Sequence, residues 1–328
     1  MAGAIAGTAI LNCKLQDKLH TVALTINNVC NLSCPHCYLQ YDGPNGLISA
    51  ELQDHLFRSE FQHLAIVGKE PLATKLSSQL CVDLARRCHS SAKTASLITN
   101  GSRLSALAVD DARLFSWIDV SFDGGPSTYS SYRKGDYAGI IKALAHLRLN
   151  GYENINALHV LNDQTISEID DMMQIAAAYP FQRIMFSPYI VTSNHGNNYV
   201  RPVSILTILG ALAESESFRS NSSTLLVIDS AHLRNANLSF DECSDFIDHY
   251  RLSSKVLMIK EEPIKYGIVR LNYDGIALSP TDSLDPATYH ANGVHLNHTP
   301  GVNLEDIFAL YCERLTNPHA HSESFVLV

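Results

Sequence analysis

The sequence predicts an α/β fold: a partial (β/α)6 barrel of the TIM type with a small α+β extension at its C-terminus. Two observations support this prediction. Apolar, β-branched segments alternate with amphipathic segments between residues 21 and 190, and each apolar segment is followed by polar or glycine residues. Strands that alternate with helices form parallel βαβ units, and barrel sites form at the carboxyl ends of the strands. We therefore expect the functional residues at these strand ends.

The first predicted strands are short apolar runs of the kind found in buried sheets. They cover residues 21–26, 63–67, 94–99, 117–122, 155–160 and 183–186. Helices are predicted between them, because apolar residues recur there at helical spacing, as in Leu76, Leu80, Leu84 and Cys88. Ser49 is predicted to cap the first helix, and Thr165 with Glu168 to form a capping box.

Beyond residue 190 the alternation becomes weaker. Helices are predicted at 205–212 and 240–250, and strands at 224–228, 256–259 and 268–271. Residues 272–275, Asn-Tyr-Asp-Gly, are predicted to form a hairpin turn. We divide the chain into a lead-in (1–20), a barrel (21–250) and an extension (251–328).

The composition favours a globular protein that binds neither nucleic acid nor membranes. The chain has 328 residues and a net charge of −9, which argues against a general affinity for nucleic acid or anionic lipid. No apolar segment is long enough to span a bilayer, and residues 1–13 lack the basic start and strong apolar centre of an export signal. We therefore expect a cytoplasmic protein.

Three of the eight cysteines, Cys30, Cys34 and Cys37, follow the first predicted strand within one loop. Thiolates are soft ligands that select zinc or iron–sulfur clusters over hard cations. Iron–sulfur clusters usually take four cysteines, so three would leave one iron of a 4Fe–4S cluster open to a small molecule. A structural zinc site with His36 as fourth ligand is the alternative, and it predicts a binding protein without catalysis.

The spacing Cys30-x-x-x-Cys34-x-x-Cys37, with His36 before the last cysteine, resembles the cluster loop of radical S-adenosylmethionine (SAM) enzymes. The resemblance implies one 4Fe–4S cluster on these cysteines, with SAM chelated at the open iron. It also implies a flavodoxin- or ferredoxin-type electron donor. Reductive cleavage of SAM would give a 5′-deoxyadenosyl radical that abstracts hydrogen from a substrate.

Further motifs resemble the SAM-binding segments of this family. The segment Gly68-Lys69-Glu70-Pro71 is similar to Gly-Gly-Glu-Pro, which implies that Gly68 and Glu70 contact the SAM amino group, and Lys69 departs from the pattern. The resemblance also implies SAM contacts at Asn100, Ser121 and Asp123. Asn-Gly and Asp-Gly are also common turn dipeptides, so a purely local role remains the alternative for the last three.

The C-terminal part resembles, more faintly, the SPASM extension of peptide-modifying radical SAM enzymes. The similar segments are residues 269–280 and 301–308, where the cysteines that hold auxiliary clusters are missing. This favours redox-neutral chemistry, such as maturation, epimerisation or rearrangement, on a peptide or a small natural-product intermediate. Cys243 and Cys312 are hydrogen-donor candidates by elimination only. Substrate or adenine contacts are expected at His159, Asn162 and Tyr189, beside strand ends.

Overall fold

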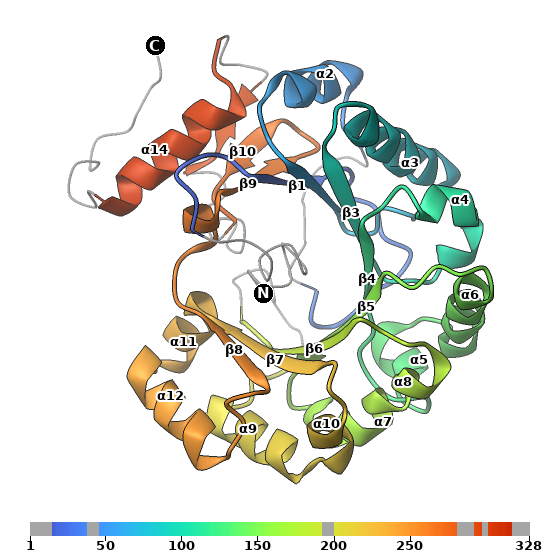
Figure 1. Cartoon of the computed structure of the whole chain (residues 1–328), viewed down its shortest axis with the longest axis vertical. Helices are drawn as coiled ribbons and strands as arrows, with labels where there is room; N and C mark the ends of the chain where they lie inside the picture. Colours follow the sequence, from blue (N-terminus) through green and yellow to red (C-terminus); the bar gives the residue numbers. More distant parts are fainter. Residues whose placement is uncertain (1–14, 38–45, 192–199, 281–291, 297–300, 317–328) are drawn as a thin grey trace.

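The computed structural model describes residues 15–37, 46–191, 200–280, 292–296 and 301–316 (Figure 1). Within these residues, the strands form one sheet in the order β11-β10-β9-β1-β2-β3-β4-β5-β6-β7-β8. The strands are β1 (Thr21–Thr25), β2 (His63–Val67), β3 (Thr94–Thr99), β4 (Trp117–Ser121), β5 (Ile155–Leu161), β6 (Arg183–Pro188), β7 (Thr224–Asp229), β8 (Val256–Ile259), β9 (Ile268–Asn272), β10 (Ile276–Leu278) and β11 (Val294–His295).

The sheet curves into a barrel that is not closed. All neighbours from β9 through β1 to β8 pair in parallel, whereas β10 and β11 pair antiparallel. Among the described strands, β8 pairs only with β7 and β11 only with β10. The predicted α/β class with a partial barrel is therefore confirmed. The parallel sheet continues beyond the predicted unit of six strands, through β7 and β8 on one edge and β9 on the other.

Helices cover the outer, convex face of the sheet (Figure 1). The α-helices are α2 (Ala50–Arg58), α3 (Lys75–Ser90), α4 (Val109–Ala112), α5 (Tyr129–Arg133), α6 (Tyr137–Leu149), α7 (Ile169–Met173), α8 (Ile175–Ala178), α9 (Ile205–Glu214), α10 (Glu216–Ser220), α11 (Ser230–Ala236), α12 (Phe240–His249) and α14 (Leu304–Thr316). Short 3-10 helices are η2 (Leu104–Ala106), η3 (Ile166–Glu168) and η4 (Pro263–Tyr266). No helix in the described part of the chain is both long and apolar enough to cross a membrane.

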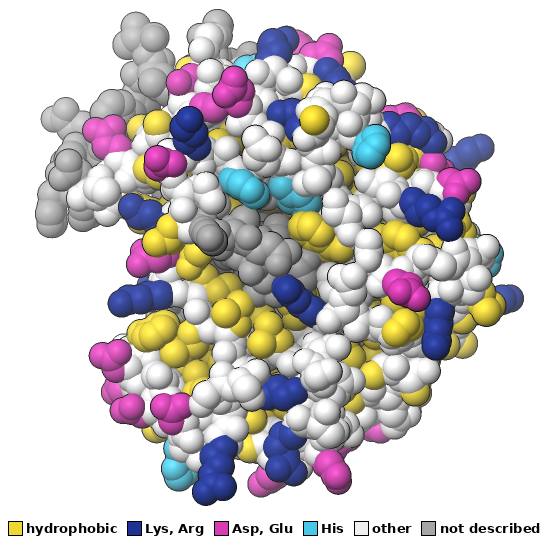
Figure 2. Space-filling model, viewed as in Figure 1, with side chains coloured by type: hydrophobic (Ala, Val, Ile, Leu, Met, Phe, Trp, Pro, Cys, Tyr) yellow, Lys and Arg dark blue, Asp and Glu magenta, His cyan; other side chains and the backbone are white. Residues whose placement is uncertain are grey.

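Two layers of apolar side chains hold the sheet. The larger layer lies between the sheet and the helices and includes Leu24, Leu64 and Leu97. A smaller one includes Ala23, Met185 and Val227, which alternate with outward-facing neighbours and therefore face the barrel interior. On the face drawn in Figure 2, hydrophobic side chains gather around the centre and most charged ones lie toward the periphery. The inner face of the sheet thus contributes apolar side chains to the barrel interior.

The local predictions at turns and caps had mixed outcomes. The Ser49 hydroxyl accepts a hydrogen bond from the Leu52 amide at 3.1 Å, as predicted for a helix cap. The hairpin turn is also confirmed, because the Gly275 amide donates to the Asn272 carbonyl between β9 and β10. The capping box of Thr165 with Glu168 was wrong.

Glu168 does not turn back to Thr165, because it binds the loop that follows β4. Its carboxylate accepts a hydrogen bond from the Gly125 amide at 2.9 Å and one from the Thr128 hydroxyl. The Thr165 hydroxyl instead donates to the Val160 carbonyl at 2.9 Å. A tertiary contact has therefore replaced the local one that the spacing indicated.

The C-terminal strands join the same sheet as the barrel. β9 pairs in parallel with β1, and β8, which also follows residue 250, pairs in parallel with β7. Helix α14 packs on β9, β10 and η4. The division of the chain at residue 250 and the SPASM-like character of the extension stay predictions.

Gly101, directly after β3, offers a test of the strand-end geometry. Its φ is +77°, and an added Cβ would lie 2.9 Å from Val120 Cγ1. A non-glycine residue in the left-handed conformation costs ~1–2 kcal/mol. Gly101→Ala is expected to lower the free energy of unfolding by more than this, because the added Cβ also clashes with Val120. Gly151→Ala is the matched control, since φ is +73° but nothing lies within 4 Å of the added Cβ. Urea denaturation of both variants measures the difference, and equal losses would contradict the steric clash.

Candidate functional site

A pocket lies at the carboxyl ends of the parallel strands, on the inside of the barrel. It is lined by Cys30, Leu32, Cys34, His36, Cys37, Val67, Gly68, Lys69, Glu70, Ile98, Thr99, Asn100, Ser121, Asp123, Arg133, Leu158, His159, Val160, Met185, Phe186, Ser187 and Val227. The structure thus brings together all three loop cysteines and all five predicted SAM contacts. These are the strand ends at which barrel sites form.

The cysteine loop is fastened to the segment that follows β2. The Asn27 side-chain amide donates to the Glu70 carbonyl at 2.9 Å, and the Glu70 amide donates to the Val29 carbonyl at 3.0 Å. Gly68 lies against the same loop, because an added Cβ would be 3.0 Å from Asn27 Oδ1. Glycine therefore permits the close approach of the two segments.

Glu70 joins the ends of β2 and β3 through its carboxylate. One oxygen accepts from the Leu72 amide at 2.9 Å and the Thr99 hydroxyl at 2.6 Å, and the other accepts from the Asn100 amide at 2.6 Å. The side chain is fully buried, and burial raises its pKa although these donors oppose the shift. In this structure the Glu70 carboxylate thus links the ends of β2 and β3 by hydrogen bonds.

Glu70→Gln tests how much these hydrogen bonds of Glu70 contribute to stability. The NH2 group of Gln would face one of the donors that now bind the carboxylate, so at least one buried donor would lose its acceptor. We therefore expect the free energy of unfolding to fall by about 1–3 kcal/mol. The measurement is urea denaturation of the protein without added cofactor. Glu242→Gln, at an exposed helix cap in α12, is a control for the substitution itself. An unchanged midpoint for Glu70→Gln would show that these hydrogen bonds contribute nothing to the free energy of unfolding.

Asn100 orients the first cysteine of the loop. Its side-chain amide donates to the Cys30 sulfur at 3.8 Å and to Asn31 Oδ1 at 3.1 Å. Its oxygen accepts from the Ser102 hydroxyl at 2.6 Å, and Ser102 in turn accepts from Asn31. The turn dipeptide Asn100-Gly101 therefore has a specific contact with the cysteine loop in addition to its local conformation.

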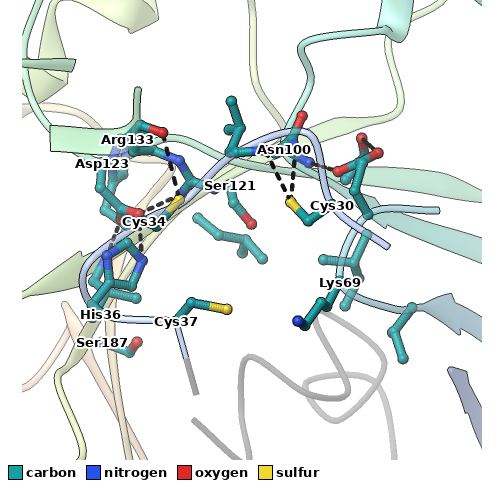
Figure 3. Close-up of a pocket in the computed structure, with 18 of the residues that line it drawn as sticks. Cys30, Cys34, His36, Cys37, Lys69, Asn100, Ser121, Asp123, Arg133 and Ser187 are labelled. Atoms are coloured by element: carbon teal, nitrogen blue, oxygen red, sulfur yellow. Dashed lines mark hydrogen bonds and ion pairs between the residues drawn. The ribbon is translucent and has the colours of Figure 1, made fainter. Parts of the chain in front are cut away.

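A buried charge cluster lies on the β4 side of the pocket (Figure 3). The Asp123 carboxylate pairs with the Arg133 guanidinium of α5 and with His36 Nε2 at 3.1 Å, and it accepts from the Val160 amide at 2.6 Å. Burial acts to raise the pKa of Asp123, but Arg133 and His36 outweigh it and hold that pKa below its usual range. Asp123 is therefore an anion at neutral pH.

His36 faces this cluster and not the thiols. Its ring stacks on Tyr132 with centroids 5.1 Å apart, and the Tyr132 hydroxyl accepts from the Asn162 amide at 2.6 Å. Among the described residues, no three His, Cys, Asp or Glu side chains are placed to hold one metal ion. His36 is thus oriented by Asp123 and Tyr132, whereas the zinc alternative requires its ring to turn toward the thiols.

The three thiols of the cysteine loop all line the pocket. Cys30, Cys34 and Cys37 form no disulfide with the described residues, are partly exposed and border one space (Figure 3). Burial raises the pKa of the Cys30 and Cys34 thiols, so a metal would have to displace their protons.

Several candidates lie elsewhere. Cys243 is buried in α12 and Cys312 is half-buried in α14, and neither lines the pocket. Their prediction as hydrogen donors thus finds no support, because both thiols belong to the outer helical layer. Asn162 and Tyr189 are buried but also absent from the lining, whereas His159 lines it and stacks on Phe186.

The sequence reasoning missed Arg133 and Tyr132. Both belong to α5, which follows the Asp123 segment, and their partners are ten residues or more away in the sequence. A short helix with an unremarkable composition gives no motif that marks them. Only the proximity of a basic residue to a predicted strand end could have indicated a partner for Asp123.

The likeness to solved structures concerns the fold. SuiB of Streptococcus suis bound to precursor peptide SuiA is 13% identical, with a TM-score of 0.59 over 93% of this chain and 67% of that chain. SuiB bound to S-adenosylmethionine is 14% identical, with a TM-score of 0.53 over 80% and 60%. The anSMEcpe structure with bound AdoMet is 15% identical, with a TM-score of 0.50 over 88% and 80%. The chain thus spans about two thirds of the length of SuiB or less.

The sequence comparisons give one family. No curated protein matches the chain. The family model of the Radical SAM superfamily matches residues 24–176, from β1 to α8, which include the cysteine loop and four strand ends of the pocket. Residues 24–176, a little under half of the chain, are therefore similar to a radical SAM domain.

Proposed function

We propose that the chain is a radical SAM enzyme in which Cys30, Cys34 and Cys37 hold one 4Fe–4S cluster. The observation that carries the proposal is the position of the three thiols, which lie within the matched residues and border one pocket. When bound, the cluster and SAM would supply one-electron cleavage of SAM to methionine and a 5′-deoxyadenosyl radical. The electron would come from a flavodoxin- or ferredoxin-type donor in the cytoplasm.

The chain's own residues would position SAM and keep water away from the radical. Gly68, Glu70 and Asn100 lie on one side of the pocket, next to the cysteine loop that they fasten. Ser121 and Asp123 lie at the end of β4. We assign these five residues to SAM binding, with Glu70 acting through the segment it holds. An apolar wall would limit the access of water to the reacting atoms; it is made of Val67, Ile98, Leu158, Met185 and Val227.

A peptide is the substrate class that we favour, and a small natural-product intermediate is the other. SuiB, whose fold this chain shares, was solved with a precursor peptide. None of the five cysteines outside the loop forms a C-x-x-C pair, so their spacing gives no local ligand set for an auxiliary cluster. We therefore propose hydrogen abstraction followed by redox-neutral chemistry, such as epimerisation or rearrangement.

Anaerobic purification and metal analysis test the proposal. We expect about four irons with matching sulfide per chain. After reduction, the same sample given SAM should form 5′-deoxyadenosine, which is measured by chromatography. One zinc per chain, with no SAM cleavage by the iron-reconstituted protein, would contradict the proposal and favour a zinc-stabilised binding protein.

A further inference from the structure

Lys69 occupies a fixed position at the rim of the pocket. It lies between Gly68 and Glu70, and Glu70 is hydrogen-bonded to the cysteine loop through its amide and through its carbonyl. The backbone at Lys69 therefore has little freedom. In Figure 3 the Lys69 side chain points into the space that Cys30 and Cys37 also border. A primary ammonium is thus presented to whatever fills the pocket.

This ammonium has no ion pair or hydrogen bond with the residues that the structure describes. The pocket's acidic groups are already engaged. Asp123 is paired with Arg133 and His36, and the Glu70 carboxylate accepts three hydrogen bonds from the chain. Figure 3 draws Lys69 apart from the Asp123–Arg133 pair. The described lining therefore offers no counterion to Lys69.

An ammonium beside an apolar wall needs an anion once a ligand displaces its water. Burial of a charge is costly unless the charge is paired and hydrogen-bonded. A charge-assisted hydrogen bond to a carboxylate is among the stronger polar contacts in proteins. Lysine acts as a point charge on a flexible stem, so it tolerates a range of carboxylate orientations. A ligand with a carboxylate near Lys69 would thus bind in preference to a neutral one.

We propose that Lys69 is the anion-binding residue of this pocket and that its ligand is a carboxylate. The carboxylate belongs either to an acidic substrate or to SAM itself. This inference rests on the proposed function and extends it to the class of ligand that the pocket selects. A substrate carboxylate is the favoured source, because two of the predicted SAM contacts, Ser121 and Asp123, lie at the end of β4, away from Lys69 (Figure 3).

The test measures binding to the cluster-loaded protein under anaerobic conditions. The variants are Lys69→Met, which keeps the stem and removes the charge, and Lys69→Arg, which keeps the charge. The first probe is SAM, with decarboxylated SAM as its twin. The second is glutarate, titrated into SAM-saturated protein, with neutral glutaramide as its twin. Iron content and circular dichroism of the variants show that the fold and cluster are intact.

Each source gives its own pattern. If the carboxylate belongs to the substrate, Lys69→Met abolishes glutarate binding and leaves the Kd of SAM unchanged. Lys69→Arg then retains glutarate binding. If it is SAM's, Lys69→Met weakens SAM by about ten- to hundredfold, the range of a hydrogen bond to a charged group, but leaves decarboxylated SAM unchanged. Two results would overturn the proposal. In the first, Lys69→Met binds SAM and glutarate with the same Kd as the unmodified protein. In the second, the unmodified protein binds glutarate no better than glutaramide, and Lys69→Met leaves the Kd of SAM unchanged.

Failure of the proposed function would be recognised separately. A protein that takes up no iron and does not bind SAM fails before any variant is compared. A protein that binds iron and SAM but whose ligand affinities are independent of Lys69 retains the proposed function and loses only this inference.

Discussion

Replacement of Cys30, Cys34 or Cys37 by Ala is expected to remove the iron and to reduce 5′-deoxyadenosine formation to background. Each of the three thiols lines the same pocket, and a cluster held by only three cysteines has no ligand to spare. The loss should be the largest of any single substitution in the chain. Iron and sulfide analysis, followed by chromatography of the SAM products, measures it.

Cys243→Ala and Cys312→Ala are the matched controls. They remove a thiol from α12 and α14, outside the pocket. Both variants should keep the iron and the SAM cleavage of the unmodified protein. If a loop variant retained its iron, the assignment of that cysteine as a ligand would fail. If product formation in heavy water also proceeds unchanged in both controls, neither thiol is the hydrogen donor.

Asp123→Ala is expected to destabilise the fold strongly, by about 3–5 kcal/mol, because it leaves the Arg133 charge buried without its partner. The side chains of Asp123 and Arg133 are 1% and 7% exposed, and the carboxylate also fixes the Val160 amide of β5. Arg133 itself is held as a cation, because Cys34 and Asp123 raise its pKa against the effect of burial. Chemical denaturation measures the loss.

Two further variants isolate the charge effect in Asp123→Ala. The double variant Asp123→Leu with Arg133→Met removes both charges, and we expect it to recover much of the stability, since apolar replacements of a buried pair are often neutral. Asp111→Ala breaks the surface pair with Arg86, in which the side chains are 29% and 51% exposed. That change should cost less than about 1 kcal/mol. Equal losses for Asp123→Ala and Asp111→Ala would contradict the role of burial.

The features that sequence patterns predicted were those set by local physics. Apolar runs gave the strands of the barrel, and the cap at Ser49 and the turn at Gly275 depend on contacts within a few residues. The convergence of Cys30, Glu70 and Asp123 at one pocket was predictable as well. Parallel strands bring their carboxyl ends together, so residues after successive strands must meet.

The features that were missed depend on distant partners. Glu168 had a suitable spacing for a capping box, but the Gly125 amide, forty-three residues away in the sequence, binds its carboxylate. His36 had a suitable type for a metal ligand, but Asp123 and Tyr132 orient it otherwise. Local spacing states which contacts are possible. The competition with tertiary partners is decided only in the folded chain.

The pairing of β9 with β1 has a consequence for the order of folding. β1 precedes the cysteine loop, and one of its two neighbouring strands, β9, is synthesised more than two hundred residues later. The Arg270 guanidinium of β9 donates to the Thr25 hydroxyl of β1, 245 positions away in the sequence. Until β9 emerges from the ribosome, β1 has an open edge, which is a template for aggregation. Because long-range pairings form slowly, the support of the cysteine loop is completed only after Ile268–Asn272 has been made and has paired with β1. A chain truncated before β9 would present its cysteine loop beside a strand with an open edge, so insertion of the proposed cluster is best delayed until the whole sheet has formed.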